Sequence, residues 1–156
     1  MDDEILAVVQ PSSPRRTFGV AVLAGLGALL IYVALARPPA NLFWGTFLLG
    51  LGGFFLWGAH RMQMATRGWL ELTATELRTN DGVVIARVAD IRSLDRGMFA
   101  FKPSNGFMLR LSAKTPRCWR PGLWWSLGDR IGVGGVTSAH QTKAMAEIIS
   151  AMIASR

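Results

Sequence analysis

The stretch that decides the fold runs from residue 17 to residue 59 and reads TFGVAVLAGLGALLIYVALARPPANLFWGTFLLGLGGFFLWGA. Its one charged residue, Arg37, stands in a proline-containing turn between two uncharged runs. A helix that crosses a bilayer core needs about 20 apolar residues, so each run is long enough to span. The sequence therefore predicts a transmembrane hairpin over residues 17–59, with helices at about 17–36 and 42–57.

Small residues recur along both predicted helices, and such residues let helix backbones approach closely in lipid. We expect them to form the contact inside the hairpin, and the alternative is a face for a partner helix. The residues concerned are Ala21, Gly25, Ala28, Thr46, Gly50 and Gly53. Phe43, Trp44 and Trp57 stand near the ends of the second helix, where aromatic rings favour the membrane interface.

The basic residues around the hairpin predict its orientation. Four arginines flank it and one lies in its turn: Arg15, Arg16, Arg61 and Arg67 against Arg37. Cytoplasmic flanks carry the excess of Lys and Arg, so both termini of a multi-pass inner-membrane protein are predicted in the cytoplasm. Residues 1–16 start acidic and continue with Pro11-Ser12-Ser13-Pro14, which predicts a flexible cytoplasmic tail rather than a signal peptide.

The charge is uneven along the chain. Its total is +7, and residues 60–156 alone carry 14 basic and 7 acidic groups. A basic domain tied to a membrane most simply faces anionic headgroups. The sequence has no Lys/Arg run and no recognition motif for nucleic acid, so no nucleic-acid partner is expected. Cys118 is the single cysteine, which excludes an intramolecular disulfide.

Short alternating runs follow a linker at residues 60–68. Period-two alternation is typical of strands with one buried face, and Asp81-Gly82 between two such runs predicts a hairpin. Arg120-Pro121-Gly122-Leu123 fits a type II turn. We expect about seven strands, over residues 69–73, 77–79, 83–88, 91–96, 98–102, 107–112 and part of 123–133.

An amphipathic helix is predicted at the C-terminal end of the chain. Ser138 followed by Gln141 fits a capping box. The apolar residues after it recur at spacings of three and four, which predicts one buried helical face: Met145, Ile148, Ile149, Met152 and Ile153. The predicted fold is thus a membrane hairpin plus an α+β domain at 69–156, a small antiparallel β-barrel or sandwich closed by this helix.

This order of elements resembles a pleckstrin-homology-like domain, and with the hairpin it resembles bacterial membrane proteins that carry such domains. The resemblance rests on residues 70–77 (LELTATEL), on residues 88–91 (VADI) and on the helix from Ser138. It implies a binding or scaffolding module, since this fold does not define one function. Lipid-binding eukaryotic members have basic residues in the first hairpin loop, whereas residues 73–76 here read TATE, so phosphoinositide recognition is not implied.

No residue pattern predicts a catalytic, cofactor or metal site. The glycines of residues 131–136 precede the last helix and could cradle an anion, but a dinucleotide fold needs a βαβ unit, so a glycine turn is the better interpretation. His60 and His140 lie too far apart in sequence to suggest a metal site. Asp90 and Asp95 are expected on opposite faces of a strand. Cys118 is expected to be a packing residue or an exposed thiol.

Basic residues and tryptophans concentrate between residues 114 and 130. Tryptophan favours the headgroup layer and arginine pairs with phosphate there. We therefore hypothesise a membrane or partner contact through Lys114, Arg117, Trp119, Arg120, Trp124, Trp125 and Arg130. In the alternative interpretation Trp124 and Trp125 divide between the core and the surface.

Two classes of function remain open from the sequence. The favoured hypothesis is a non-enzymatic interaction or scaffolding module that binds membrane lipids or another membrane protein, in a narrower form as the accessory subunit of a membrane complex. The alternative is a membrane-bound enzyme acting on lipid headgroups, with Asp90, Asp95 or His140 as acid or base.

Overall fold

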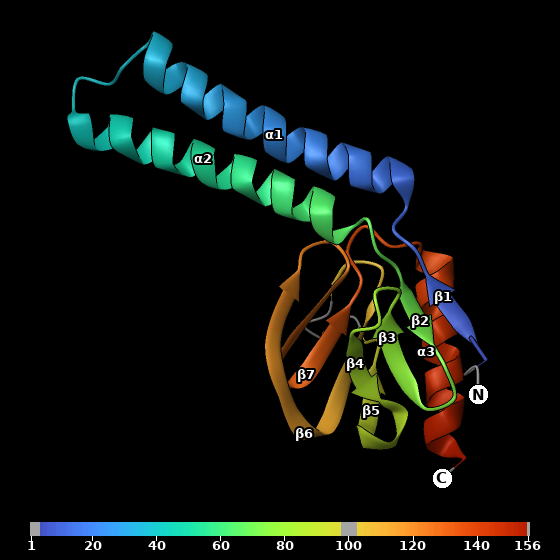
Figure 1. Cartoon of the computed structure of the whole chain (residues 1–156). Helices are drawn as coiled ribbons and strands as arrows, with labels where there is room; N and C mark the ends of the chain where they lie inside the picture. Colours follow the sequence, from blue (N-terminus) through green and yellow to red (C-terminus); the bar gives the residue numbers. More distant parts are fainter. Residues whose placement is uncertain (1–3, 98–102, 156) are drawn as a thin grey trace. The chain divides into compact units, whose positions relative to one another are not determined.

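The computed structural model describes residues 4–97 and 103–155, and the chain divides into two compact units (Figure 1). One unit is the helical hairpin, residues 13–64. The other is a domain built from the residues before Ser13 together with those after Met64. The domain is therefore assembled from two chain segments that the hairpin separates.

The hairpin consists of helix α1 (Ser13–Ala36) and helix α2 (Leu42–Ala65), each of 24 residues. Both helices extend beyond their predicted bounds, and both are long and apolar enough to cross a membrane. Proline cannot donate a backbone hydrogen bond, so the Pro38-Pro39 pair ends α1. Asn41 then starts α2, because its side-chain oxygen accepts a hydrogen bond from the Phe43 N–H at 2.9 Å.

The two helices meet at a pair of glycines. A Cβ atom added to Gly27 would lie 2.8 Å from the Gly52 carbonyl oxygen, and one added to Gly52 would lie 2.9 Å from the Gly27 carbonyl oxygen. Ala34 and Ala59 are also buried, with 6% and 5% of their surface exposed. Close backbone approach at small residues thus holds the hairpin together, as expected for helices in lipid.

The predicted residues for this contact are wrong. Gly25, Gly50 and Gly53 have open space where a Cβ would stand, and the other three are exposed: Ala21, Ala28 and Thr46. The physical reason is helical phase, because residues two apart point to nearly opposite sides of a helix. Gly25 therefore faces away when Gly27 faces the partner helix. The alternative role, a face for another helix, stays a prediction.

The domain is α+β, with two antiparallel sheets and one long helix. The first sheet has the order β1-β2-β3-β4 and the second the order β5-β6-β7. Within the described residues the strands form no closed barrel, and the predicted strand at 98–102 lies outside those residues. The elements are β1 (Ala7–Val9), β2 (Leu70–Leu72), β3 (Glu76–Thr79), β4 (Val84–Arg87), the 3-10 turn η1 (Val88–Asp90), β5 (Ile91–Asp95), β6 (Phe107–Arg120), β7 (Trp124–Val133) and α3 (Ala139–Ala154).

Strand β1 corrects the prediction of a flexible N-terminal tail. It pairs with β2 in antiparallel register, so that Val9 stands opposite Leu70. Both of these side chains are fully buried in the core. The prediction missed β1 because three residues are too few for a period-two pattern, and the partner strand lies some 60 positions later in the chain.

The predicted turns are confirmed. Gly82 joins β3 to β4 with φ 82°, and its N–H donates to the Thr79 carbonyl at 2.9 Å. Gly122 has φ 84°, and the Leu123 N–H donates to the Arg120 carbonyl at 3.1 Å, as the type II assignment requires. Glycine takes this left-handed conformation without the steric cost that a Cβ would add.

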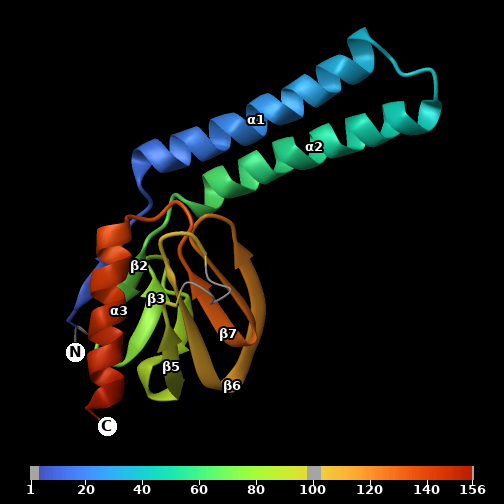
Figure 2. The same cartoon turned by 180° about the vertical axis from the view of Figure 1, so that it is seen from behind.

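The strands of the β6–β7 hairpin are longer than predicted, and β6 is strongly curved (Figures 1 and 2). Its register shifts twice within residues 110–118, and such bulges bend a strand. Ser126 holds the bulged segment together: its hydroxyl accepts a hydrogen bond from the Cys118 N–H at 3.0 Å and donates one to the Pro116 carbonyl at 2.6 Å. Cys118 itself is half-buried against the core.

Helix α3 contacts β1 of the first sheet and β5 of the second, on the side of the domain opposite β6 (Figure 2). Its predicted apolar face is confirmed, since Met145 and Ile149 are fully buried and Met152 packs against the core. The predicted capping box is wrong. Ser138 makes no side-chain cap bond, and the Gln141 side chain instead accepts a hydrogen bond from the Gln10 N–H at 2.8 Å.

Candidate functional site

The two chain segments that connect to the helices leave the domain at one end, which we call the tether end. Antiparallel pairing puts Val9, the last residue of β1, beside Leu70, the first residue of β2. Residues 10–12 follow β1 and residues 66–69 precede β2. Both segments therefore meet the first sheet at the same end. The first segment is also held by α3, because the Ser138 N–H donates to the Gln10 carbonyl at 3.2 Å.

Two turns and one loop complete the tether end. The Val136 N–H donates to the Gly122 carbonyl at 3.0 Å, and the Ser12 N–H donates to the Val136 carbonyl at 2.7 Å. On the other connection, the Asn80 N–H donates to the Trp69 carbonyl at 3.0 Å. The tether end thus comprises residues 10–12, 66–69, 80–82, 120–123 and 134–138.

Arg120 forms an ion pair with Asp81 at the tether end of the domain. Its guanidinium lies 3.0 Å from the Asp81 carboxylate, and 29% and 48% of the two side chains are exposed. The pKa of Asp81 is lowered from 3.8, chiefly because the Thr79 hydroxyl donates a hydrogen bond to its carboxylate. Partial burial opposes this shift and the Arg120 charge adds to it. Arg120 therefore links the β6–β7 hairpin to the β3–β4 turn.

The three tryptophans of the predicted contact segment have different environments. Trp124 belongs to the core with 4% exposure, and its indole N–H has no hydrogen-bond partner among the described residues. Trp125 is partly exposed and its indole lies against Gly132, which leaves no room for a Cβ there. Trp119 stands opposite Trp125 and is 50% exposed. The division of Trp124 and Trp125 between core and surface matches the alternative interpretation.

The remaining cations of the predicted segment are exposed: Lys114, Arg117 and Arg130. Arg130 stands directly opposite Arg110 across the β6–β7 pair. Like charges opposite each other on neighbouring strands repel, which makes this part of the sheet favourable for anions.

Trp69 is a surface residue that the sequence reasoning missed. It is 37% exposed and lies four positions after α2 ends. The Asn80 side chain accepts a hydrogen bond from its N–H at 3.0 Å, and its indole N–H donates to Glu71 at 2.9 Å. Its position just after an apolar helix could have indicated a role at the membrane surface, because tryptophan favours the membrane interface.

The acidic and histidine candidates do not come together into one site. Asp90 lies in η1, Asp95 ends β5 and accepts a hydrogen bond from the Gly97 N–H at 2.7 Å, and His140 is exposed in the first turn of α3. His60 lies in the hairpin unit. Across residues 4–97 and 103–155, no three His, Cys, Asp or Glu side chains form a group that could hold a metal ion.

Comparison with known proteins adds no relative to this picture: no protein-family model, curated protein or solved structure matches the chain.

Proposed function

We propose that this is an integral membrane protein in which α1 and α2 form a transmembrane hairpin and the α+β domain is a non-enzymatic interaction module at the membrane surface. The observation that carries the proposal is the pairing of β1 with β2. This pairing ties both ends of an apolar hairpin to one folded domain.

The β1–β2 pair restricts the topology of the hairpin. Three residues separate Val9 from Ser13, and four separate Ala65 from Leu70. An extended chain covers at most about 3.6 Å per residue, so neither connection can cross a bilayer core of about 30 Å. These short connections support a topology in which both ends of the hairpin lie on the same side of the membrane as the domain. The flanking arginines favour the cytoplasmic side of an inner membrane.

The surface of the helices supports the membrane span. Only 11% of the apolar window of each helix is buried, whereas a core helix of a water-soluble protein would be mostly covered. Large side chains such as Phe18, Tyr32 and Leu42 are 72%, 67% and 85% exposed. An apolar surface of this extent requires lipid or a partner to cover it.

The interaction role is supported by the tether end and by the fold. Trp69 and Trp119 are exposed near the point where the helices connect, and Arg67, Arg117 and Lys114 are exposed as well. We propose that the domain is pleckstrin-homology-like, which its two antiparallel sheets and terminal helix support, and that it binds lipid headgroups or a membrane-protein partner. The accessory-subunit role belongs to the same proposal, with the exposed small-residue face of the hairpin available to a partner helix.

Labelling of single cysteines in the full chain tests the topology, in a Cys118→Ser background. We expect Glu4→Cys and Ser150→Cys to react from one side of sealed vesicles and Ala40→Cys from the other. All three positions are exposed. The protein should also stay in the membrane after alkaline carbonate extraction. Release by carbonate, or reaction of positions 4 and 150 from opposite sides, would refute the proposal.

A further inference from the structure

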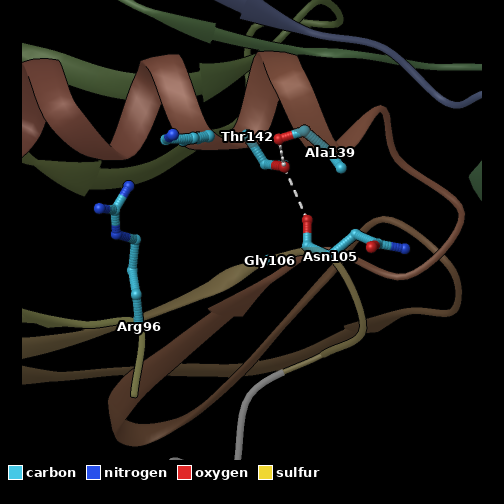
Figure 3. Close-up of a pocket in the computed structure, with 6 residues that line it drawn as sticks. Arg96, Asn105, Gly106, Ala139 and Thr142 are labelled. Carbon is cyan, nitrogen blue, oxygen red and sulfur yellow. Dashed lines mark hydrogen bonds between the residues drawn. The ribbon is translucent and has the colours of Figure 1, made fainter. Parts of the chain in front are cut away.

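A basic pocket lies between the connection that precedes β6 and the first turns of α3 (Figure 3). Its volume is about 350 Å³, and it is lined by Arg96, Asn105, Gly106, Ala139, Thr142 and Lys143. Two of these residues are cationic and none is acidic. Arg96 extends from the end of β5 toward α3 (Figure 3). The sequence reasoning did not single out Arg96 or Lys143 for binding, since they lie 47 positions apart.

The wall of the pocket opposite Arg96 is held by internal contacts. The Thr142 side chain is 2% exposed, and its hydroxyl donates a hydrogen bond to the Asn105 carbonyl at 2.6 Å. The same oxygen lies 3.0 Å from the Ser138 carbonyl. Gly106 packs so closely against the backbone of Val133 and Gly134 that a Cβ would not fit. Asn105 is therefore attached to the first turn of α3, and Gly106 to the end of β7, by buried contacts.

The charges of the pocket favour an anion. Arg96 lies 3.8 Å from Glu147, but 40% and 57% of these side chains are exposed, so water weakens the pair and an anion can compete with it. Lys143 is exposed on α3, one helical turn before Glu147. Ser138 provides no side-chain cap, so the N–H groups in the first turn of α3 also lack that acceptor.

The pocket lies close in the structure to the tether end. Ala139, which lines it, follows Ser138, whose N–H donates to the Gln10 carbonyl at 3.2 Å. On its other side, the Ser104 carbonyl accepts a hydrogen bond from the Gly135 N–H at 2.8 Å. Only residues 10–12 separate β1 from the first helix. If the hairpin spans a bilayer, this short connection ties the domain that holds the pocket to the lipid surface and raises the effective concentration of headgroups around it.

We propose that this pocket binds a phosphate group, contributed by an anionic lipid headgroup or by a dissolved phosphate. Arg96 offers paired N–H donors to the phosphate oxygens, and Lys143 adds a second positive charge. The lipid source rests on the proposed transmembrane function, whereas the phosphate chemistry of the pocket does not.

The test uses the isotope-labelled full chain in zwitterionic nanodiscs and follows the backbone amide signals of Gly106 and Thr142, which no variant replaces. One arm adds inorganic phosphate at constant ionic strength, and the other replaces phosphatidylcholine by phosphatidylglycerol. We expect a saturable shift of both signals in at least one arm, which identifies the source. The double variant Arg96→Gln/Lys143→Gln should weaken this binding at least tenfold.

A matched control removes the same charge elsewhere. Arg87 and Arg92 are exposed and do not line the pocket, so Arg87→Gln/Arg92→Gln should leave binding within twofold of the original chain. Lys143→Arg should retain binding, because it keeps the positive charge at this position. Its binding separates loss of charge from disturbance of the fold by a substitution at residue 143. Absence of a saturable shift in both arms, or equal weakening by both double variants, would overturn the proposal. A chain released by carbonate that still binds phosphate would refute the membrane span and leave the pocket intact.

Discussion

The hairpin and the α+β domain place their apolar side chains in opposite ways. In the hairpin, glycine and alanine lie in the contact between helices, while Phe18, Tyr32 and Leu42 point outward. In the domain, large side chains such as Phe107 and Ile149 are fully buried. The difference follows from the proposed solvent of each unit: in water burial of large apolar groups stabilises the fold, whereas in lipid only close packing distinguishes the inside of a bundle from the outside.

The largest effect is expected from a charge placed in the core at β1. Val9 is fully buried, so Val9→Asp should destabilise the domain by about 4 kcal/mol or more, because an unpaired carboxylate would lose its water. Denaturant unfolding of the full chain in detergent, followed by tryptophan fluorescence, measures this. Ile5→Asp is the control, since Ile5 is 46% exposed just before the strand. Similar stability of the two variants would mean that β1 is not part of the domain core.

A smaller loss is expected at α3. Ile149 is fully buried, and truncation of a buried isoleucine to alanine costs about 2 to 5 kcal/mol. Ser150→Ala on the exposed side of the same helix should change the free energy of unfolding by less than about 0.5 kcal/mol. The same denaturant experiment compares the two. If Ser150→Ala is the more harmful change, the helical face assigned to the core is wrong.

In the hairpin, a larger side chain at the helix contact should lower stability, because glycines already fill this contact. Gly27→Val places a side chain against the Gly52 backbone, and overpacking costs typically about 1 to 3 kcal/mol. Gly25→Val projects into open space and should have little effect on the helix contact. Unfolding of the full chain by increasing dodecyl sulfate, monitored by circular dichroism, gives the two midpoints. Equal midpoints would contradict the Gly27–Gly52 contact. If instead only Gly25→Val disturbs co-purification with another membrane protein, the outer face is a partner surface.

The smallest effect is expected at the Asp81–Arg120 pair. Because the folded state lowers the pKa of Asp81 from 3.8, its contribution is fully present above this unfolded value and is lost as the pH falls through the lower folded value. Exposed pairs contribute about 0 to 1 kcal/mol, so Asp81→Asn should lower stability slightly at pH 7 and not at all near pH 2. Asp129→Asn, at an exposed position of β7, is the control for removal of a carboxylate. A pH-independent loss in Asp81→Asn would indicate that its hydrogen bonds matter rather than its charge.

The parts of the fold that the sequence predicted correctly have local causes. The apolar runs, the glycine turns at 81–82 and 120–123, the alternation of Phe107, Leu109 and Leu111 and the apolar face of α3 each depend on neighbours within a few positions. The predicted contact segment was less successful, because Trp124 and Arg120 have the residue types of a membrane surface but are used for the core and for a link to Asp81. Residue type does not distinguish these roles without knowledge of the partners.

By itself the sequence determined that two apolar helices form a hairpin and that an α+β domain accompanies them, since hydrophobic period and turn chemistry act over short distances. Only the tertiary structure decided that β1 belongs to that domain, that Gly27 and Gly52 rather than Gly25 and Gly50 form the helix contact, and that Arg96 and Lys143 line one pocket. Each of these features joins segments that are far apart in the chain. Their pairing depends on register, helical phase and chain path, which no short stretch of sequence encodes.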